Sequence, residues 1–273
     1  AAALLAVGAT GLAMAQTTTL GTRGTTSQAN TAITTNAGST WKEYTRGEDH
    51  AGSVTLPLQF ISTASGQRLA VLVSVPADAS GNPVPGTFPV ILTQTAYRID
   101  TGQLLGSVFQ SGNTLLVGGV DKFMNKRGYI SVAVDVVGSG MSTGEAQLLG
   151  AAEQQGHADA VDWVTKQPWF NGQLGLAGTS YLGITALQTA KQQHPAVKAV
   201  FAQVPMGDAY RGTVGIGGLL NAQFISLWLP LTQSLSVSNK NAAKNNPDFA
   251  DLINAANEQH IAAIDSWYLP TVD

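Results

Sequence analysis

From residue 54 onward the hydrophobic pattern changes to short apolar runs bounded by turn residues. Residues 54–60 and 68–75 flank a Ser-Gly dipeptide, an arrangement that predicts a β-hairpin. Residues 89–94 and 129–136 are nearly continuous apolar runs rich in β-branched side chains. Such runs are typical of strands that are covered on both faces, as in a parallel sheet.

Helical patterns alternate with these strands. Between residues 145 and 167 apolar side chains recur at a helical spacing, and a proline follows. A second helix is predicted from 180 to 194, between a short strand at 174–177 and another buried strand at 197–204. The order strand, helix, strand, helix, strand favours an α/β fold with a mostly parallel sheet, flanking helices and right-handed crossovers.

The first 45 residues fall into two segments of different composition. Residues 1–15 are small and apolar, end in Ala-Met-Ala and are too few to span a membrane. They predict the remnant of a signal peptide, with an ordinary buried helix as the alternative. Residues 16–45 are rich in Thr, Gly, Ser and Asn, and predict a low-complexity linker. We therefore expect a secreted or periplasmic protein whose mature chain has no stable membrane span.

The sequence after the last predicted strand is rich in Gly and then polar and compatible with helices. No further strand of the sheet type is expected there. The core is therefore predicted at 46–210, and an incomplete helical cap insertion over the sheet at 211–273. Within that insertion Trp228 is interpreted as a packing anchor.

Composition narrows the chemistry. The 273 residues carry 14 basic and 17 acidic side chains, for a formal net charge of -3, without a long basic run, so no nucleic-acid partner is expected. There is no cysteine, which excludes a disulfide framework and a thiolate nucleophile. The four histidines are scattered without the pairing on one helical face that is typical of metal sites. We expect neither a metal nor another cofactor.

The segment from Gly178 to Gly183 reads GTSYLG and lies between a predicted strand and a predicted helix. A serine in a tight strand-to-helix turn is the nucleophile elbow of α/β-hydrolases, and small residues must flank it because the turn is strained. In the generic motif G-x-S-x-G the second glycine comes one residue earlier. The motif alone therefore leaves open that Ser180 only caps the helix of a non-catalytic fold.

A longer stretch carries a family resemblance. Residues 167–175 read QPWFNGQLG and, with the elbow, resemble the QPW-x-NG-x-[VL]-G-x-x-G-x-SYLG segment of the Xaa-Pro dipeptidyl-peptidase and cocaine esterase (CocE/NonD) family. Upstream, RGY at 127–129, Asp135 and GSGMSTGE at 138–145 are similar to that family's RGY…D-x-RG-x-G-x-S-x-G-E stretch. Val137 stands where the family usually has arginine, so we do not expect that arginine's local ion pair here.

The resemblance covers about residues 54–210 and implies an α/β-hydrolase fold. It implies that Ser180 attacks an ester or amide carbonyl to form an acyl-enzyme. It also implies that the backbone N–H of Tyr181 and the phenol of Tyr97 stabilise the resulting oxyanion, the alternative being that Tyr97 only packs under its loop. The small-molecule or peptide substrate stays open between an Xaa-Pro peptide, an ester and an acyl amide, and a non-catalytic binding module is the rival of another class.

The resemblance further implies a catalytic acid and a histidine after the serine. His194 would end the helix that Ser180 begins, roughly 21 Å away at 1.5 Å per residue. His260 falls in the predicted insertion and is expected in solvent. We therefore expect that the chain is truncated at both ends, that the acid and the histidine lie beyond residue 273, and that this fragment alone lacks its base. The alternative is a complete chain that uses His260.

Overall fold

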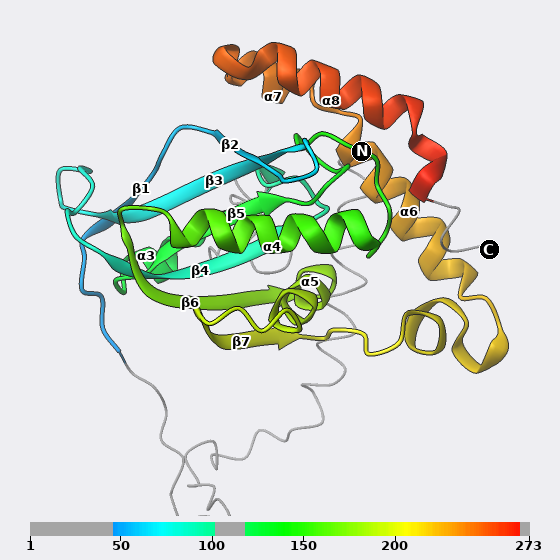
Figure 1. Ribbon diagram of the computed structural model, residues 1–273, viewed down its shortest axis with the longest axis horizontal. Coiled ribbons are helices and arrows are strands. Elements are labelled where there is room, and N and C mark those ends of the chain that lie inside the picture. The colour runs from blue at the N-terminus through cyan, green and yellow to red at the C-terminus, as the bar shows by residue number, and fades with distance from the viewer. Residues whose placement is uncertain (1–45, 102–117, 268–273) are drawn as a thin grey trace, which may run out of the picture. The chain divides into compact units, whose positions relative to one another are not determined.

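The computed structural model describes residues 46–101 and 118–267 (Figure 1). The predicted signal-peptide remnant and the predicted linker lie outside these residues, and they stay predictions. The contacts within the chain define two compact units, one that ends at Gly47 and one that begins at Glu48. The second unit contains every helix and strand that the structure describes. In these two ranges no helix combines the length and the apolar character that a membrane crossing requires.

One mixed sheet organises the described residues. Its strands are β1 (Gly52–Thr55), β2 (Gln59–Ser62), β3 (Arg68–Ala77), β4 (Phe88–Thr95), β5 (Ile130–Asp135), β6 (Phe170–Thr179) and β7 (Val197–Gln203). The four strands β5, β4, β6 and β7 are neighbours in that order and run parallel, whereas β3 is antiparallel to β5 and pairs with both β1 and β2. The prediction of a mostly parallel sheet is confirmed. The predicted hairpin forms between β2 and β3, and its first strand is interrupted near Pro57, which lacks the N–H that a sheet ladder needs.

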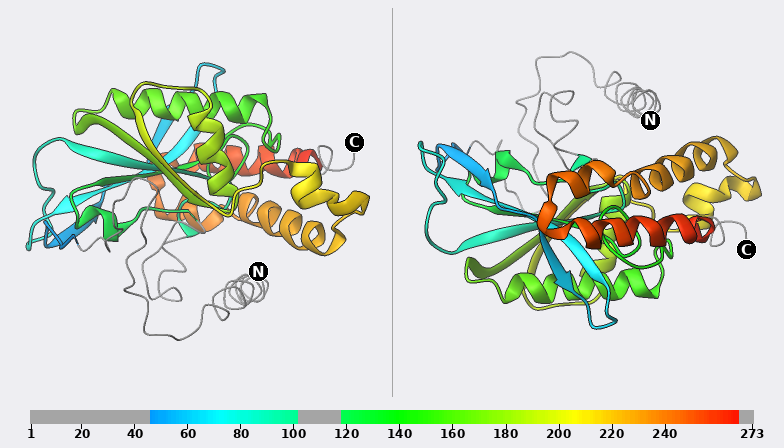
Figure 2. Two further views of the ribbon diagram at one scale, coloured as in Figure 1. Left: turned by 90° about the horizontal axis from the view of Figure 1, so that it is seen from below. Right: turned by 90° about the horizontal axis from the view of Figure 1, so that it is seen from above.

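Helices cover both faces of this sheet. They are α3 (Lys122–Asn125), α4 (Ala151–Thr165), α5 (Tyr181–Ala190), α6 (Ala222–Ser236), α7 (Lys240–Asn245) and α8 (Ala250–Ala262). Figure 2 shows α4 and α7 on opposite sides of the sheet. Helices α6 to α8 fall within the range predicted as a cap insertion, a division of the chain that stays a prediction.

The core follows from the twofold alternation of side chains along a strand. One apolar cluster joins one face of β3 and β5 to Val161 and Val164 of α4 and to Ala186 of α5. A second cluster joins the other face to Ala243 of α7 and Ile253 of α8. Strand β3 shows the alternation directly: Leu69, Val71, Val73 and Val75 belong to the first cluster, and Ala70 and Leu72 to the second.

Strand β7 corrects one expectation. The run at 197–204 was predicted to be a buried strand, but Val200 is 39% and Phe201 57% exposed. The prediction of burial is wrong because β7 is an edge strand that pairs only with β6 among the described strands. An apolar run thus indicates a strand without indicating how many neighbours cover it.

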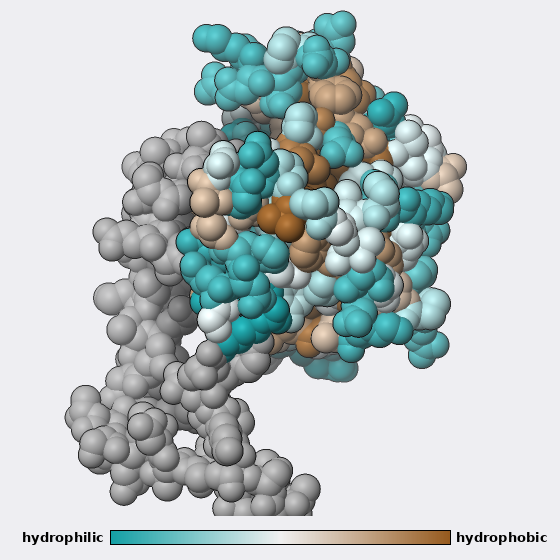
Figure 3. All heavy atoms as spheres, turned by 90° about the vertical axis from the view of Figure 1, so that its left-hand side faces the viewer, coloured by the Kyte–Doolittle hydropathy of each residue, from teal (hydrophilic) through white to brown (hydrophobic). Residues whose placement is uncertain are grey.

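The two ends of the parallel strands differ in character. Figure 3 shows the end of the sheet where these strands begin, and hydrophilic side chains (teal) there surround smaller hydrophobic areas (brown). The strands finish at the opposite end, where Thr95, Asp135, Thr179 and Gln203 are the last residues of β4, β5, β6 and β7. In open α/β sheets that second end is the usual place for a binding site.

Asp135 joins the loops that follow β4 and β5. Its Oδ1 accepts a hydrogen bond from the backbone N–H of Ile99 at 2.8 Å, and its Oδ2 accepts one from the N–H of Met141 at 2.9 Å. A β-carbon at Gly140 would collide with the carboxylate, so only glycine fits there. Because the side chain is completely buried, its pKa rises to about 8 in spite of these hydrogen bonds. Val137 packs in the apolar cluster instead of offering the charge of an arginine.

The raised pKa of Asp135 predicts a pH-dependent stability. Between about pH 4 and about pH 8 the folded state binds the Asp135 proton and the unfolded state does not. The free energy of unfolding should therefore fall as the pH rises through this window, by up to about 1.4 kcal/mol per pH unit from this group. Urea unfolding of the intact protein and of its Asp135→Asn variant at pH 5 and pH 7.5 measures the effect. Equal pH slopes for the two proteins would contradict it.

Candidate active site

Ser180 lies at the turn between β6 and α5. Its backbone has φ 58° and ψ -123°, a conformation that is uncommon and strained for a residue other than glycine. Its N–H donates to the carbonyl of Gln203 at 2.9 Å, and its carbonyl accepts from the N–H of Ile184 at 3.0 Å. The side chain makes no capping hydrogen bond to α5. This is the strand-to-helix turn that the sequence predicts, and its serine does not cap the helix that follows.

Two glycines allow this turn to be so tight. A β-carbon at Gly178 would collide with Leu182, the residue that stands where the generic motif has its second glycine. A β-carbon at Gly183 would lie 3.0 Å from the carbonyl oxygen of Gln203, closer than nearly all real contacts of that kind. The late glycine therefore serves the approach of α5 to β7, and Gly178 makes room for the leucine.

Tyr97 follows β4 by two residues and reaches the same point. Its N–H donates to Thr95 Oγ1 at 2.9 Å, and its phenol accepts a hydrogen bond from Trp228 Nε1 at 3.0 Å. The phenol also interacts with the side chain of Ser180 and with the backbone of Tyr181. Burial raises the pKa of the Tyr97 phenol, and these hydrogen bonds oppose the rise. The structure thus brings together all three residues that the family resemblance singles out.

This arrangement fits an oxyanion hole in its chemistry. The Tyr97 oxygen already accepts from an indole, so its own proton is available to a second partner. The backbone N–H of Tyr181 lies at the start of α5, where the helix dipole favours negative charge. An oxygen that becomes negative on a carbonyl attacked by Ser180 would meet both donors. The individual roles of Ser180, Tyr97 and Tyr181 stay predictions.

Trp228 has a polar contact that the sequence analysis did not predict. It belongs to α6, and its ring stacks on Phe224 with centroids 6.2 Å apart and lies 5.9 Å from the ring of Tyr181. Its hydrogen bond to Tyr97 joins residues that are 131 positions apart in the chain. No local pattern could have indicated this contact, and a tryptophan interpreted only as a packing anchor also orients a polar group of the site.

An apolar pocket of about 290 Å³ adjoins Ser180. It lies at the end of the sheet where β6 and β7 finish, and α6 contributes part of its wall. No charged side chain lines it within the described part of the chain. The lining residues are Leu148, Leu149, Ser180, Tyr181, Ile184, Val204, Met206, Ala209, Thr213, Val214, Phe224, Ile225 and Trp228.

The two histidines that follow Ser180 in the chain are bound elsewhere. His260 is only 4% exposed, and its Nδ1 donates to the carbonyl of Ser236 at 2.9 Å. The expectation that His260 is solvated is therefore wrong, because one side of α8 packs onto the body of the protein. Burial lowers the pKa of His260. His194 Nδ1 accepts from the N–H of Ala196 at 3.1 Å.

Three comparisons with known proteins identify relatives of this chain. The family model described as X-Pro dipeptidyl-peptidase (S15 family) matches residues 65–271. Cocaine esterase from Rhodococcus sp. (strain MB1 Bresler) is 29% identical over 208 residues, which are 76% of this chain and 32% of that protein. A Mycobacterium bovis protein named as an inferred serine esterase is 32% identical over 180 residues, which are 62% of this chain and 27% of that protein.

Solved structures agree on the fold. A CocE/NonD family hydrolase from Staphylococcus aureus superimposes with a TM-score of 0.57 at 22% sequence identity, over 80% of this chain and 40% of that one. The family model confirms the family resemblance, and the solved structure confirms the α/β-hydrolase fold. The chain spans about a third of the length of the curated relatives that it matches.

The position of the Tyr97 phenol predicts a kinetic effect. Tyr97→Phe keeps the ring packed and removes the donated proton, so it should lower kcat for an acyl ester by roughly 10²- to 10³-fold, the loss expected for one oxyanion donor. Steady-state kinetics of the intact protein measure this loss. Tyr129→Phe is the matched control, because Tyr129 directly precedes β5 at the other end of the sheet. A Tyr97→Phe variant as active as the control would show that the phenol only packs.

Proposed function

Because this chain belongs to the X-Pro dipeptidyl-peptidase (S15) family, we propose that it carries the nucleophile of a serine hydrolase that cleaves an ester or amide bond through an acyl-enzyme on Ser180. One observation carries the proposal. The Ser180 hydroxyl sits on a strained turn beside two hydrogen-bond donors, the Tyr97 phenol and the N–H of Tyr181. That combination serves acyl transfer and has no evident use in packing.

The reaction would proceed in two steps, the acylation of Ser180 and the hydrolysis of the acyl-enzyme. Ser180 Oγ attacks the acyl carbon while its proton passes to a general base, and the oxyanion forms between Tyr97 and Tyr181. The bond to the leaving alcohol or amine then breaks, and the base returns the proton to that group. Water attacks the acyl-enzyme in the same way and releases the acid, with Ser180 restored.

We further infer that the general base and its acid lie outside the described residues. The described interactions of the His260 imidazole are with the backbone of Ser236 and of Ser142, and none is with Ser180. The described contacts of His194 are to Ala196 and to Asp162, whose Oδ1 lies 3.6 Å from His194 Nε2. The relatives are between three and four times as long as the matched region, so most of their sequence has no counterpart in it.

The pocket favours one class of acyl group. Its apolar lining can bury an uncharged acyl chain, whereas the described lining residues offer no carboxylate to pair with the α-ammonium of an Xaa-Pro peptide or of an amino-acid ester. We therefore propose an ester or amide of a compact, uncharged acid as the substrate, and place the Xaa-Pro dipeptidyl activity and the amino-acid ester hydrolase activity second.

Covalent labelling tests the nucleophile. A fluorophosphonate should modify the intact protein at Ser180, and mass spectrometry of the tryptic peptide would identify the site. Ser180→Ala should abolish the label. Ser226→Ala, on the exposed side of α6, should leave it unchanged. A folded protein that takes up no label would favour the rival assignment, a non-catalytic binding module.

A matched pair of esters tests the acyl preference. The p-nitrophenyl esters of 3-methylbutanoic acid and of valine share a leaving group and a carbon skeleton, and only the second has an α-ammonium. After subtraction of spontaneous hydrolysis, the uncharged ester should have a kcat/KM higher by at least about tenfold. A faster reaction with the valine ester, or with an Xaa-Pro p-nitroanilide, would contradict the proposed substrate class.

A further inference from the structure

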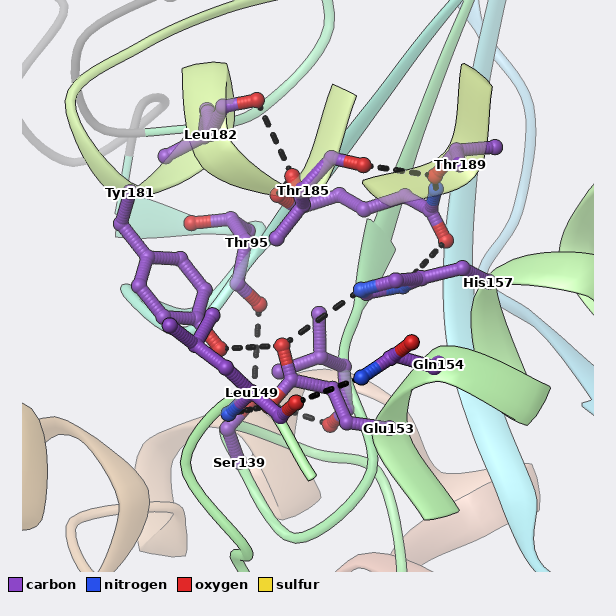
Figure 4. A network of polar contacts seen from close by, with 12 residues as sticks. Thr95, Ser139, Leu149, Glu153, Gln154, His157, Tyr181, Leu182, Thr185 and Thr189 are labelled. Atoms are coloured by element: carbon purple, nitrogen blue, oxygen red, sulfur yellow. Dashed lines mark hydrogen bonds and ion pairs between the residues drawn. The ribbon is translucent and has the colours of Figure 1, made fainter. Parts of the chain in front are cut away.

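A buried carboxylate lies directly behind the candidate active site. Glu153, in the first turn of α4, is only 2% exposed. Its Oε1 accepts a hydrogen bond from the phenol of Tyr181 at 2.5 Å, and its Oε2 accepts one from the N–H of Leu149 at 2.9 Å (Figure 4). Both of these partners line the pocket beside Ser180. A single side chain thus connects the nucleophile elbow to another wall of the pocket.

His157 lies beside this carboxylate on the same helix. It lies one turn further along α4, is 1% exposed, and places Nε2 3.5 Å from Glu153 Oε1. Its Nδ1 lies 3.0 Å from Gln94 Oε1, on β4. His157 thereby links helix α4 to strand β4.

One backbone carbonyl sets the direction of the hydrogen bonds between α5 and His157. The carbonyl of Thr185 can only accept, so the Thr189 hydroxyl donates to it at 2.7 Å. The same hydroxyl must then accept from Gln94 Nε2 at 2.7 Å, which turns the amide oxygen of Gln94 toward His157. His157 Nδ1 therefore carries a proton and donates it. Figure 4 shows this chain of contacts running from α5 to Glu153.

Tyr181 needs such an anchor. It follows Ser180, whose backbone is strained, and its ring neighbours the rings of Tyr97 and Trp228, each with its centroid 5.9 Å away. Burial, followed by the nearby charge of Glu153, raises the pKa of the Tyr181 phenol well above its ordinary value. The phenol therefore stays protonated and remains a donor to the carboxylate.

We propose that Glu153 is a positioning residue for the oxyanion hole. By holding the Tyr181 phenol it fixes the direction of the Tyr181 backbone N–H, and by holding the Leu149 N–H it fixes the neighbouring wall of the pocket. The inference rests on the proposed function, in which that N–H stabilises the oxyanion.

Three variants of the intact protein test the proposal kinetically. Tyr181→Phe removes the phenol and keeps the ring and the backbone N–H, and Glu153→Gln keeps the shape and removes the charge. Each should lower kcat by about tenfold with KM changed less than twofold, because small displacements of a donor cost rate in the transition state. The double variant should lose no more than the larger single loss, since both changes break one contact. Tyr129→Phe and Glu258→Gln, an exposed residue of α8, are the matched controls.

Amide hydrogen exchange separates this proposal from the proposed function. In Glu153→Gln and Tyr181→Phe, the peptide that spans residues 178–184 should exchange at least about threefold faster than in the parent protein, while strand β3 exchanges at an unchanged rate. If the parent protein took up no fluorophosphonate, the proposed function would be refuted. The exchange rates would still show whether Glu153 orders residues 178–184. Unchanged exchange in 178–184, unchanged kcat in Tyr181→Phe, or losses that multiply in the double variant would each overturn the role of Glu153.

Discussion

The strained backbone of Ser180 is the constraint on which the rest of the site depends. A non-glycine residue at φ 58° costs about 1–3 kcal/mol and persists only where its surroundings impose it. Here the surroundings are a hydrogen bond from Ser180 N–H to Gln203, the absence of side chains at Gly178 and Gly183, and the attachment of Tyr181 to Glu153. Strand β6, helix α5 and helix α4 together hold a geometry that none of them would adopt alone.

The order of the strands explains why Tyr97 meets Ser180. Strand β4 has β5 on one side and β6 on the other. The connection after β4 therefore leads to one side of this strand, and the connection after β5 leads to the other side. Loops that follow neighbouring parallel strands at such a switch point lie close together, and here they are the loop of Tyr97 and the elbow of Ser180. Asp135 holds the first loop through Ile99, and Arg98 Nη1 donates to the carbonyl of Ser238 at 2.9 Å.

The candidate site combines an apolar surface with polar groups behind it. The walls that a substrate would touch are aliphatic and aromatic, while the carboxylate of Glu153 and the imidazole of His157 are buried behind Tyr181. Because water is excluded from such a wall, hydrogen bonds to a developing charge act there in a low dielectric. Helix α6 adds Trp228, whose indole directs the phenol of Tyr97. Apolar side chains thus form the wall that a substrate would contact, and the buried polar side chains lie in a second layer behind it.

Local patterns in the sequence determined the strands, the order of the elements, the elbow and the family, because periodicity and contiguous motifs depend only on near neighbours in the chain. They also led to Ser180, Tyr97 and Tyr181 as candidates. Tertiary structure alone decided that β7 is exposed, that His260 is buried and that Trp228 bonds to Tyr97. It also decided that Glu153 binds Tyr181, 28 residues further along the chain. The physical reason is that burial and long-range hydrogen bonds depend on which elements become neighbours in the folded sheet, and an isolated segment carries no record of its neighbours.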